Sequence, residues 1–196
     1  MPTRRLFGDD RPPNQGAMRA LPILSAFLAF LALPVLADTV QKPTHHAKTA
    51  GPKAIGTFED WTAATNKEAG QTVCYAFTRA RASAPALPGR GDVVLSVTER
   101  SSGRDAVAIS AGFAFAANAD GRLSVESASF DLYTAQRSAF ARDGHAAVKA
   151  MEHGHEAVAH LPGPKGAEVS DTFSLHGFDK AYAAIVRRCP AGKPAA

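Results

Sequence analysis

The sequence predicts a mainly β protein, an antiparallel β-sandwich with one short helix and one C-terminal helix. Apolar residues alternate with polar ones along several short segments, which is typical of strands that bury one face. Turn-forming residues separate these segments, and helical spacing occurs in two places. The chain has 196 residues, of which 45% are hydrophobic and 20% charged, so it is long enough for one domain with a sizeable core. This composition excludes a chain that is disordered throughout.

The chain opens with a segment that is expected to be a leader, residues 1–37. Its second half has Arg19 at the start, an apolar run over residues 21–33 and a small-residue cleavage site that ends at Ala37. The apolar run is shorter than the roughly 20 residues that a membrane-spanning helix needs. The pattern therefore predicts a signal peptide that starts at Met18, with no transmembrane span after cleavage. An uncleaved anchor is the alternative.

Residues 38–54 lack hydrophobic periodicity and contain Pro, Gly and Lys, so they are expected to form a flexible linker. The folded domain is expected over residues 55–190, with a tail over residues 191–196. The whole chain carries a net charge of +4, and the four Arg and two Asp of the leader account for half of it. Such a small charge does not indicate a nucleic-acid partner, which would need clustered cations.

Six segments of the domain alternate with period two, which places their apolar residues on one face of each strand. These residues are Val73, Tyr75 and Phe77 in segment 72–78; Val93, Leu95 and Val97 in 92–100; Val107, Ile109, Ala111 and Phe113 in 106–113; Leu123 and Val125 with Phe130 and Leu132; and Phe173 and Leu175 in 172–175. Between two of these segments, Asp120-Gly121 indicates a hairpin turn.

Two segments change to helical spacing. The first, near residues 143–152, places Ala147, Val148 and Met151 on one stripe. The second lies near residues 179–189, where one face consists of Phe178, Tyr182, Ile185 and Cys189.

The chain has two cysteines, Cys74 in an expected strand and Cys189 on the last helix. In an exported protein two cysteines usually pair. A disulfide is therefore expected, and it would tie the last helix to a strand near the start of the domain. Two buried free thiols are the alternative, since a redox pair would need a C-x-x-C spacing that the chain lacks.

Known catalytic motifs are missing from the sequence: there is no G-x-S-x-G, no G-x-x-x-x-G-K-[ST] and no G-x-G-x-x-G. We therefore expect no catalytic residue and no cofactor. The single tryptophan, Trp61, is expected to be a core aromatic rather than a platform for a sugar.

Histidines form the sharpest local feature, with His153, His155 and His160 close together and His145 upstream. Clustered imidazoles bind zinc or copper. However, the segment from His155 to His160 has one residue too many for H-E-x-x-H, and in a strand these two residues point to opposite faces. Surface histidines are therefore favoured, and a zinc or copper site is the alternative.

Arg90-Gly91-Asp92 is the tripeptide that integrins bind, and it lies in a Pro- and Gly-rich loop where exposure is expected. Three common residues are a weak signal, so a turn followed by the start of a strand is favoured.

Several pieces of the chain, in this order, resemble the invasion-associated locus B proteins of Gram-negative bacteria. They are Phe58-Glu-Asp-Trp61, Val73-Cys-Tyr-Ala76, the segment 105–113, and the segment 170–178 followed by an Ala-rich helix that ends in Cys189. Members of that family more often have Gly where this chain has Glu59. The resemblance implies an exported protein with an immunoglobulin-like β-sandwich and no established enzymatic activity. Of the family's features, only Cys74 and Cys189 carry over to this chain.

These patterns predict an exported, non-catalytic protein that is periplasmic, associated with the outer membrane or secreted. It is expected to bind an unknown protein or cell-surface partner, and the resemblance implies a role in host-cell interaction for some members. One alternative is a periplasmic zinc- or copper-binding protein that uses the histidines. The other is a hydrolase whose site the sequence does not reveal, because a fold alone does not define an activity.

Overall fold

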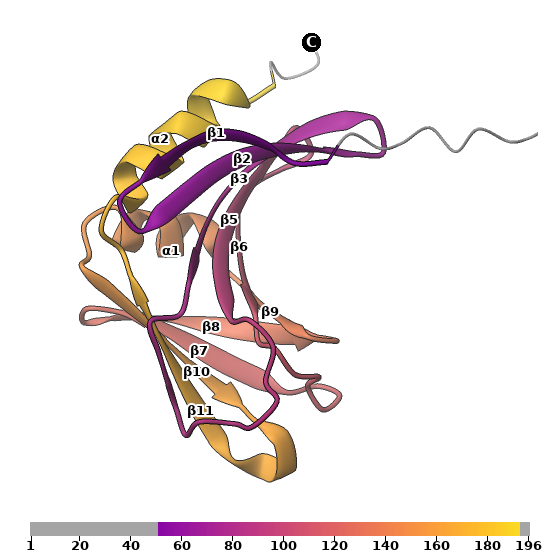
Figure 1. Ribbon diagram of the computed structural model, residues 1–196, viewed down its shortest axis with the longest axis vertical. Coiled ribbons are helices and arrows are strands. Elements are labelled where there is room, and N and C mark those ends of the chain that lie inside the picture. The colour runs from indigo at the N-terminus through magenta and orange to yellow at the C-terminus, as the bar shows by residue number, and fades with distance from the viewer. Residues whose placement is uncertain (1–50, 193–196) are drawn as a thin grey trace, which may run out of the picture. The chain divides into compact units, whose positions relative to one another are not determined.

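The computed structural model describes residues 51–192, which form eleven strands and two α-helices (Figure 1). The strands are β1 (Lys53–Phe58), β2 (Trp61–Glu68), β3 (Gln71–Arg79), β4 (Ala82–Ala84), β5 (Val94–Arg100), β6 (Gly103–Ser110), β7 (Asp120–Val125), β8 (Ala128–Ala135), β9 (Ser138–Ala141), β10 (Glu156–Pro162) and β11 (Glu168–Ser174). The helices are α1 (Gly144–Met151) and α2 (Phe178–Arg188), and a 3-10 turn, η1 (Pro164–Gly166), separates β10 from β11. The predicted mainly β architecture with two helices is confirmed.

All strand pairs are antiparallel, and the hydrogen bonds follow the order β1-β2-β3-β5-β6-β9-β8-β7-β10-β11-β4. The strands from β1 to β6, apart from β4, form one layer, and β7, β8, β10 and β11 form the other (Figure 1). Strand β9 joins the layers because it pairs with both β6 and β8. The chain crosses between layers again directly after β3, since β4 pairs with β11. The sandwich therefore has layers that are connected by hydrogen bonds.

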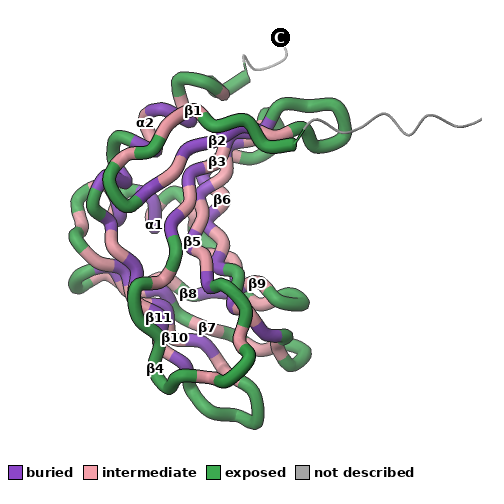
Figure 2. Tube along the Cα trace, in the orientation of Figure 1, coloured by how far each residue is buried: buried purple, intermediate pink, exposed green. Residues whose placement is uncertain are grey.

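Period-two alternation accounts for the core of both layers. Leu95, Val97, Ile109, Leu123 and Leu132 are each fully buried, as the alternation predicts, and Figure 2 shows buried and less buried residues alternating along the strands.

Strand β3 differs from the predicted pattern, in which Val73, Tyr75 and Phe77 share its buried face, because the strand turns its small residues toward helix α2. Cys74 and Ala76 are fully buried, whereas Tyr75 and Phe77 are half-buried. Helix α2 packs across β1, β2 and β3, and the small side chains give it room to approach.

The two helices begin at well-defined positions. In α1 the Asp143 carboxylate accepts a hydrogen bond from the Ala146 backbone N–H at 2.9 Å, which satisfies a donor of the first turn. In α2 the first residue, Phe178, meets Trp61 edge-to-face with ring centroids 4.7 Å apart. Trp61 is fully buried and donates its indole N–H to the Ser174 carbonyl at 3.0 Å, so the prediction of a core aromatic is confirmed.

The predicted hairpin turn at Asp120-Gly121 is wrong. Both residues lie inside β7, and the turn of the β7–β8 hairpin lies beyond Val125, which pairs with Ala128. Gly121 is required for close packing instead: a Cβ atom there would lie 2.8 Å from the Leu161 side chain and 3.0 Å from a backbone oxygen of β10. An Asp-Gly pair therefore marks a close approach between strands here.

The N-terminal boundary of the domain differs slightly from the expected one. Strand β1 begins at Lys53, so the last two residues of the predicted linker, 38–54, belong to the sheet. Strands β1, β2, β4, β9 and β10 are not among the predicted segments. In β2 the buried residues Ala63, Ala64 and Thr65 are consecutive and do not alternate. The leader, the linker through residue 50 and tail residues 193–196 lie outside the described residues.

Candidate binding surface

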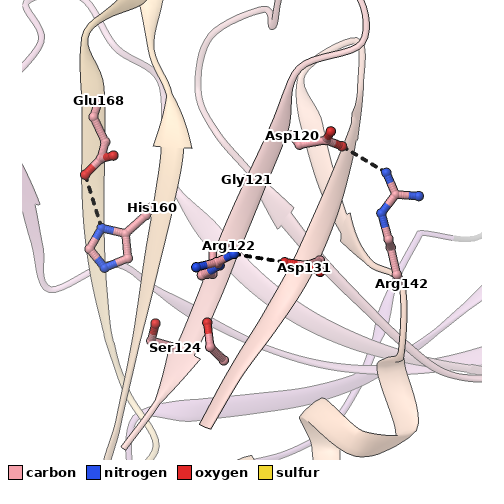
Figure 3. A pocket seen from close by; sticks show the side chains of 9 residues that line it. Asp120, Gly121, Arg122, Ser124, Asp131, Arg142, His160 and Glu168 are labelled. Carbon is pink, nitrogen blue, oxygen red and sulfur yellow. Dashed lines mark hydrogen bonds and ion pairs between the residues drawn. The ribbon is translucent and has the colours of Figure 1, made fainter. Parts of the chain in front are cut away.

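A polar groove lies on the outer face of the second layer (Figure 3). Because Leu123, Val125 and Leu132 point into the core, the alternate side chains of β7 and β8 project outward. The groove has a volume of about 730 Å³, and we call it the strand-face groove; it is lined by Asp120, Gly121, Arg122, Ser124, Ser129, Asp131, Arg142, His160 and Glu168.

Two ion pairs cross the strand-face groove. An Arg122 guanidinium nitrogen lies 3.4 Å from Asp131 Oδ1, and Arg142 donates to Asp120 Oδ1 at 2.9 Å (Figure 3). All four side chains are more than half exposed. Exposed pairs of this kind stabilise a fold by only about 0–1 kcal/mol. Charged groups of a binding partner can therefore replace one member of each pair with little loss of folding stability.

His160 completes the polar lining on β10. Its Nδ1 atom lies 3.2 Å from Ser170 Oγ and 3.5 Å from Glu168 Oε1. The groove thus presents acceptors from three carboxylates and donors from two guanidinium groups, with an imidazole and two serine hydroxyls between them. Such a lining can hydrogen-bond both donors and acceptors of a ligand.

An exposed aromatic side chain flanks the groove. Tyr133 pairs with Asp120 across β8 and β7, and at 42% exposure it is the one large hydrophobic side chain exposed among residues 51–192. Its ring stacks on Phe140 at a centroid distance of 5.4 Å, and the Arg142 guanidinium lies 5.6 Å from the ring centroid. Tyrosine and arginine are both enriched in protein interfaces.

A second polar group, the buried polar cluster, lies where β5, β6, α1 and α2 meet. It consists of the buried carboxylates Glu99 and Asp105 together with Arg104 and Tyr182, which are half-buried, and His145, which is exposed. Asp105 accepts hydrogen bonds from Tyr182 Oη at 2.6 Å and contacts His145 Nδ1 at 2.7 Å, while its own backbone N–H donates to Glu99 Oε1 at 3.1 Å. The other Glu99 oxygen lies 2.5 Å from Arg104 Nε. The cluster therefore joins both helices to the first layer.

Burial and charge shift the pKa values within this cluster. Burial raises the pKa of Glu99 to about 7, and its hydrogen bond with the neighbouring Asp105 carboxylate acts in the same direction. Burial alone would also raise the pKa of Asp105, but hydrogen bonds from Tyr182 and His145 outweigh it and lower that pKa. Burial, followed by the hydrogen bond to Asp105, raises the pKa of Tyr182. None of these residues lines the strand-face groove.

The four histidines of the predicted metal alternative are distributed over different places. His145 belongs to the buried polar cluster, His160 lines the strand-face groove, and His155 lines a separate cavity of about 400 Å³ beside the start of α2. His153 lies in the turn after α1. Among residues 51–192, no three His, Cys, Asp or Glu side chains form an arrangement that could hold a metal ion. The fold does not bring these histidines together as a site.

The predicted disulfide is present. Cys74 and Cys189 are bonded, with their Cα atoms 5.9 Å apart, and neither cysteine is free. Beside the bond, Arg104 Nη1 donates to the Cys189 carbonyl at 2.6 Å. The C-terminal end of α2 is therefore held to the sheet by a covalent bond and a charged hydrogen bond.

The expected exposure of the Arg90-Gly91-Asp92 tripeptide is wrong for its arginine. Arg90 forms two hydrogen bonds of 2.7 Å to the carboxylate of Asp171, and these side chains are 6% and 0% exposed. Its Nε atom also donates to the Ala111 carbonyl at 2.7 Å. The interpretation as a turn before a strand holds, since β5 begins at Val94.

Comparison with known proteins identifies the family. The family model described as "Invasion associated locus B (IalB) protein" matches residues 61–186, which is more than half of the chain. The chain belongs to the invasion associated locus B family. The IalB match spans the domain from the buried Trp61 to α2, and it confirms the resemblance found in the sequence.

A crystal structure of invasion associated protein B from Bartonella henselae has the same fold. It aligns with a TM-score of 0.50 and 16% sequence identity, over 71% of this chain and 97% of that one. At this identity the likeness concerns the fold alone. Among curated proteins, no relative matches the chain. Within the described residues of this IalB protein, no helix is both long and apolar enough to cross a membrane.

The strand-face groove was not predicted, although its residues carried a signal. Arg122 and Asp131 occupy the polar positions of segments whose apolar positions were assigned to the core. Their pairing depends on the register Arg122 to Asp131 and on the pairing of His160 with Arg122 across β7 and β10. Neither register follows from a single segment.

Proposed function

We propose that this IalB protein is exported to the periplasm or cell surface and acts without catalysis, by binding a macromolecular partner in the strand-face groove. The partner is a protein or another component of a cell surface. The groove itself is the observation that carries this proposal. Eight of its nine lining residues belong to four strands, β7, β8, β10 and β11, and Arg142 follows β9 directly, so the sheet holds most of the lining.

Exported location is supported by the disulfide and by the N-terminal pattern. Disulfides form and persist in oxidising compartments such as the periplasm. Cys74 and Cys189 are the only cysteines of the chain, and they are paired. The leader pattern over residues 18–37 agrees with passage through a secretion system.

The chemistry of the groove supports binding to a polar macromolecular surface. Its acidic and basic residues alternate along the sheet, so a partner with the complementary alternation would replace the pairs Arg122–Asp131 and Arg142–Asp120 by intermolecular pairs. Tyr133 at the rim offers an aromatic contact of the kind that contributes strongly to protein interfaces. The names of the family and of the Bartonella protein refer to invasion, and a host-cell component is therefore one class of partner that we propose.

Absence of catalysis is supported by the position of the group best suited to proton transfer. Glu99 has a raised pKa, but its side chain is fully buried, and among the described residues its hydrogen bonds and ion pairs are with Arg104 and Asp105. A general acid or base must reach its substrate within hydrogen-bond distance. In the described residues this carboxyl group is directed at Arg104 and Asp105 instead.

Site-specific photocrosslinking tests the proposed interface in living cells. A photoreactive amino acid replaces Ser129 in the groove or, as the control, exposed Ser102 in the turn between β5 and β6. We expect a discrete adduct from position 129 and none from position 102. The double variant Arg122→Glu/Arg142→Glu should abolish the adduct because it reverses two charges of the groove. Equal labelling from both positions, or no adduct from position 129, would contradict the proposal.

A further inference from the structure

A small cavity with a basic lining lies beside the end of α2. It is next to β1 and β2, the strands at one end of the hydrogen-bonded order, whereas the strand-face groove lies toward the other end. The small cavity has a volume of about 200 Å³, and we call it the basic pocket; it is lined by Gly51, Lys53, Thr65, Asn66, Lys67, Thr72 and Arg188. All three charged side chains are cations, and they come from three elements, β1, β2 and α2. Folding has therefore placed three positive charges around one small space.

The basic pocket lacks the carboxylates that neutralise the other cavities. The strand-face groove contains three of them, and the cavity at the start of α2 contains Glu59, Glu152 and Asp179. Within the described residues, no carboxylate lies within 4.0 Å of the amino groups of Lys53 and Lys67 or the guanidinium of Arg188. Like charges gathered without a counterion repel one another, so a bound anion would relieve this repulsion.

The acid nearest in sequence is already occupied. Glu68 follows Lys67 in β2, but both of its oxygens accept hydrogen bonds from Arg100, at 2.8 and 3.1 Å. The Cys189 carbonyl next to Arg188 is bonded by Arg104. Arg188 is therefore not required as the hydrogen-bond donor to the Cys189 carbonyl, and Lys67 is not required as the counterion of Glu68.

The neutral lining residues supply positioned groups. The Lys67 ammonium donates to Thr72 Oγ1 at 2.7 Å, which fixes its direction and leaves two further N–H bonds for a ligand. The Asn66 side-chain oxygen accepts from the Lys67 backbone N–H at 2.8 Å, so its amide NH₂ group remains a donor. Arg188 adds a planar fork of donors that matches two oxygens of a tetrahedral oxyanion.

We propose that the basic pocket binds a phosphate group. Phosphate has several acceptor oxygens and one or two negative charges, which matches a lining of cations and amide or hydroxyl donors. The group is either free phosphate or the phosphate of a lipid headgroup. The pocket shares no residue with the strand-face groove, so this proposal is independent of the proposed function.

The test uses the disulfide-bonded protein without its leader and two probes. Inorganic phosphate is titrated while amide NMR signals of β1, β2 and α2 are followed, and vesicles of phosphatidylglycerol are tested by co-sedimentation. We expect saturable binding of at least one probe at one site. Phosphate alone would identify a soluble ligand, and vesicles alone would identify a lipid headgroup; either result supports the proposal.

A matched pair of variants separates a built site from general positive charge. Lys67→Gln/Arg188→Gln removes two of the three cations of the basic pocket, and with them the charge-assisted hydrogen bonds that these side chains can donate to a phosphate. We expect the double variant to bind more than about tenfold more weakly, while Arg187→Gln, which removes a neighbouring charge outside the pocket, should change affinity by less than about twofold. All three residues are exposed, so folding should persist, and far-UV circular dichroism and a thiol assay confirm it. Binding of neither probe, or equal weakening by Arg187→Gln, would overturn the proposal.

Discussion

At the scale of single residues, the clearest feature is an ion pair with almost no contact with water. Arg90 and Asp171 bond through two parallel hydrogen bonds, and Ser83 donates a further one to the same carboxylate at 2.6 Å. The pair connects the loop before β5 with β11, which belongs to the other layer. Removing one partner would leave a buried charge without compensation.

We therefore expect Arg90→Ala to lower the free energy of unfolding by about 3–5 kcal/mol. The matched control is Arg79→Ala, which removes an arginine from an exposed pair with Asp92 at 3.4 Å and should cost less than about 1 kcal/mol. Urea denaturation followed by tryptophan fluorescence measures both, because Trp61 is fully buried. Similar losses from the two variants would show that burial of the pair has little influence on stability.

Glu99 makes stability depend on pH in the opposite direction from a typical surface carboxylate. Its pKa in the folded protein is about 7, above the value of 4.5 for a free glutamate, so the folded state retains the proton where the unfolded state loses it. The protonated Glu99 contributes its full stabilisation below pH 4.5. As the pH rises through 7 this contribution is lost, and the free energy of unfolding falls by at most about 3 kcal/mol. Asp105 has a lowered pKa, so its contribution changes only at more acidic pH.

The variant Glu99→Gln keeps the shape of the protonated side chain and cannot ionise. We expect it to remove the decline in stability between pH 5 and 7.5 and to be more stable than the parent protein at the upper end. Glu68→Gln is the control, since Glu68 is exposed and its pKa is lowered by its hydrogen bond to Arg100. Urea unfolding at several pH values measures the free energy of unfolding of the parent protein and of both variants. If the parent and Glu99→Gln curves ran parallel across this range, the pKa of Glu99 would not be raised.

At the scale of elements, α2 depends on contacts at both of its ends. At its start Gly177 adopts φ +87°, and a Cβ atom there would lie 2.2 Å from the Phe58 carbonyl oxygen. At its end the disulfide joins Cys189 to β3. A helix of 11 residues is marginal in water by itself, so tertiary contacts must hold it.

Replacing both cysteines by serine should therefore destabilise the protein by about 2–5 kcal/mol. The bond closes a loop with a sequence separation of 115 residues, which restricts the unfolded chain strongly. We expect amide hydrogen exchange to accelerate first in α2, while β7 and β10 stay protected. Reduction of the parent protein should reproduce the effect. Uniform acceleration in all strands would instead mean that α2 does not unfold separately.

For the molecule as a whole, periodicity predicted both helices and most of the inward residues. It could not predict the connection of the layers, because that depends on β9, a strand of four residues that pairs with two partners. Glu99 continues the inward alternation of Val93, Leu95 and Val97, but a glutamate is almost never fully buried unless it is paired, and its pairing with Arg104 could not be read from this segment.

Contacts between distant segments, both in the core and in the strand-face groove, could not be predicted from the sequence. Arg90 lies in a Pro- and Gly-rich loop, and only the distant Asp171 explains why its side chain is buried. In the strand-face groove, His160 and Arg122 come together through the pairing of β7 with β10, which are separated along the chain by β8, β9 and α1. The outward residues of each strand were visible in the sequence, whereas their neighbours across the sheet were not.

We propose that this IalB protein works as an exported, disulfide-linked binding domain. The most direct test is the intact mass of the protein recovered from the periplasm without reductant, before and after treatment with a thiol-alkylating reagent. We expect a chain that begins at Asp38, with no added alkyl groups because Cys74 and Cys189 are bonded. A periplasmic protein that retains its leader, or one that gains two alkyl groups, would contradict the account.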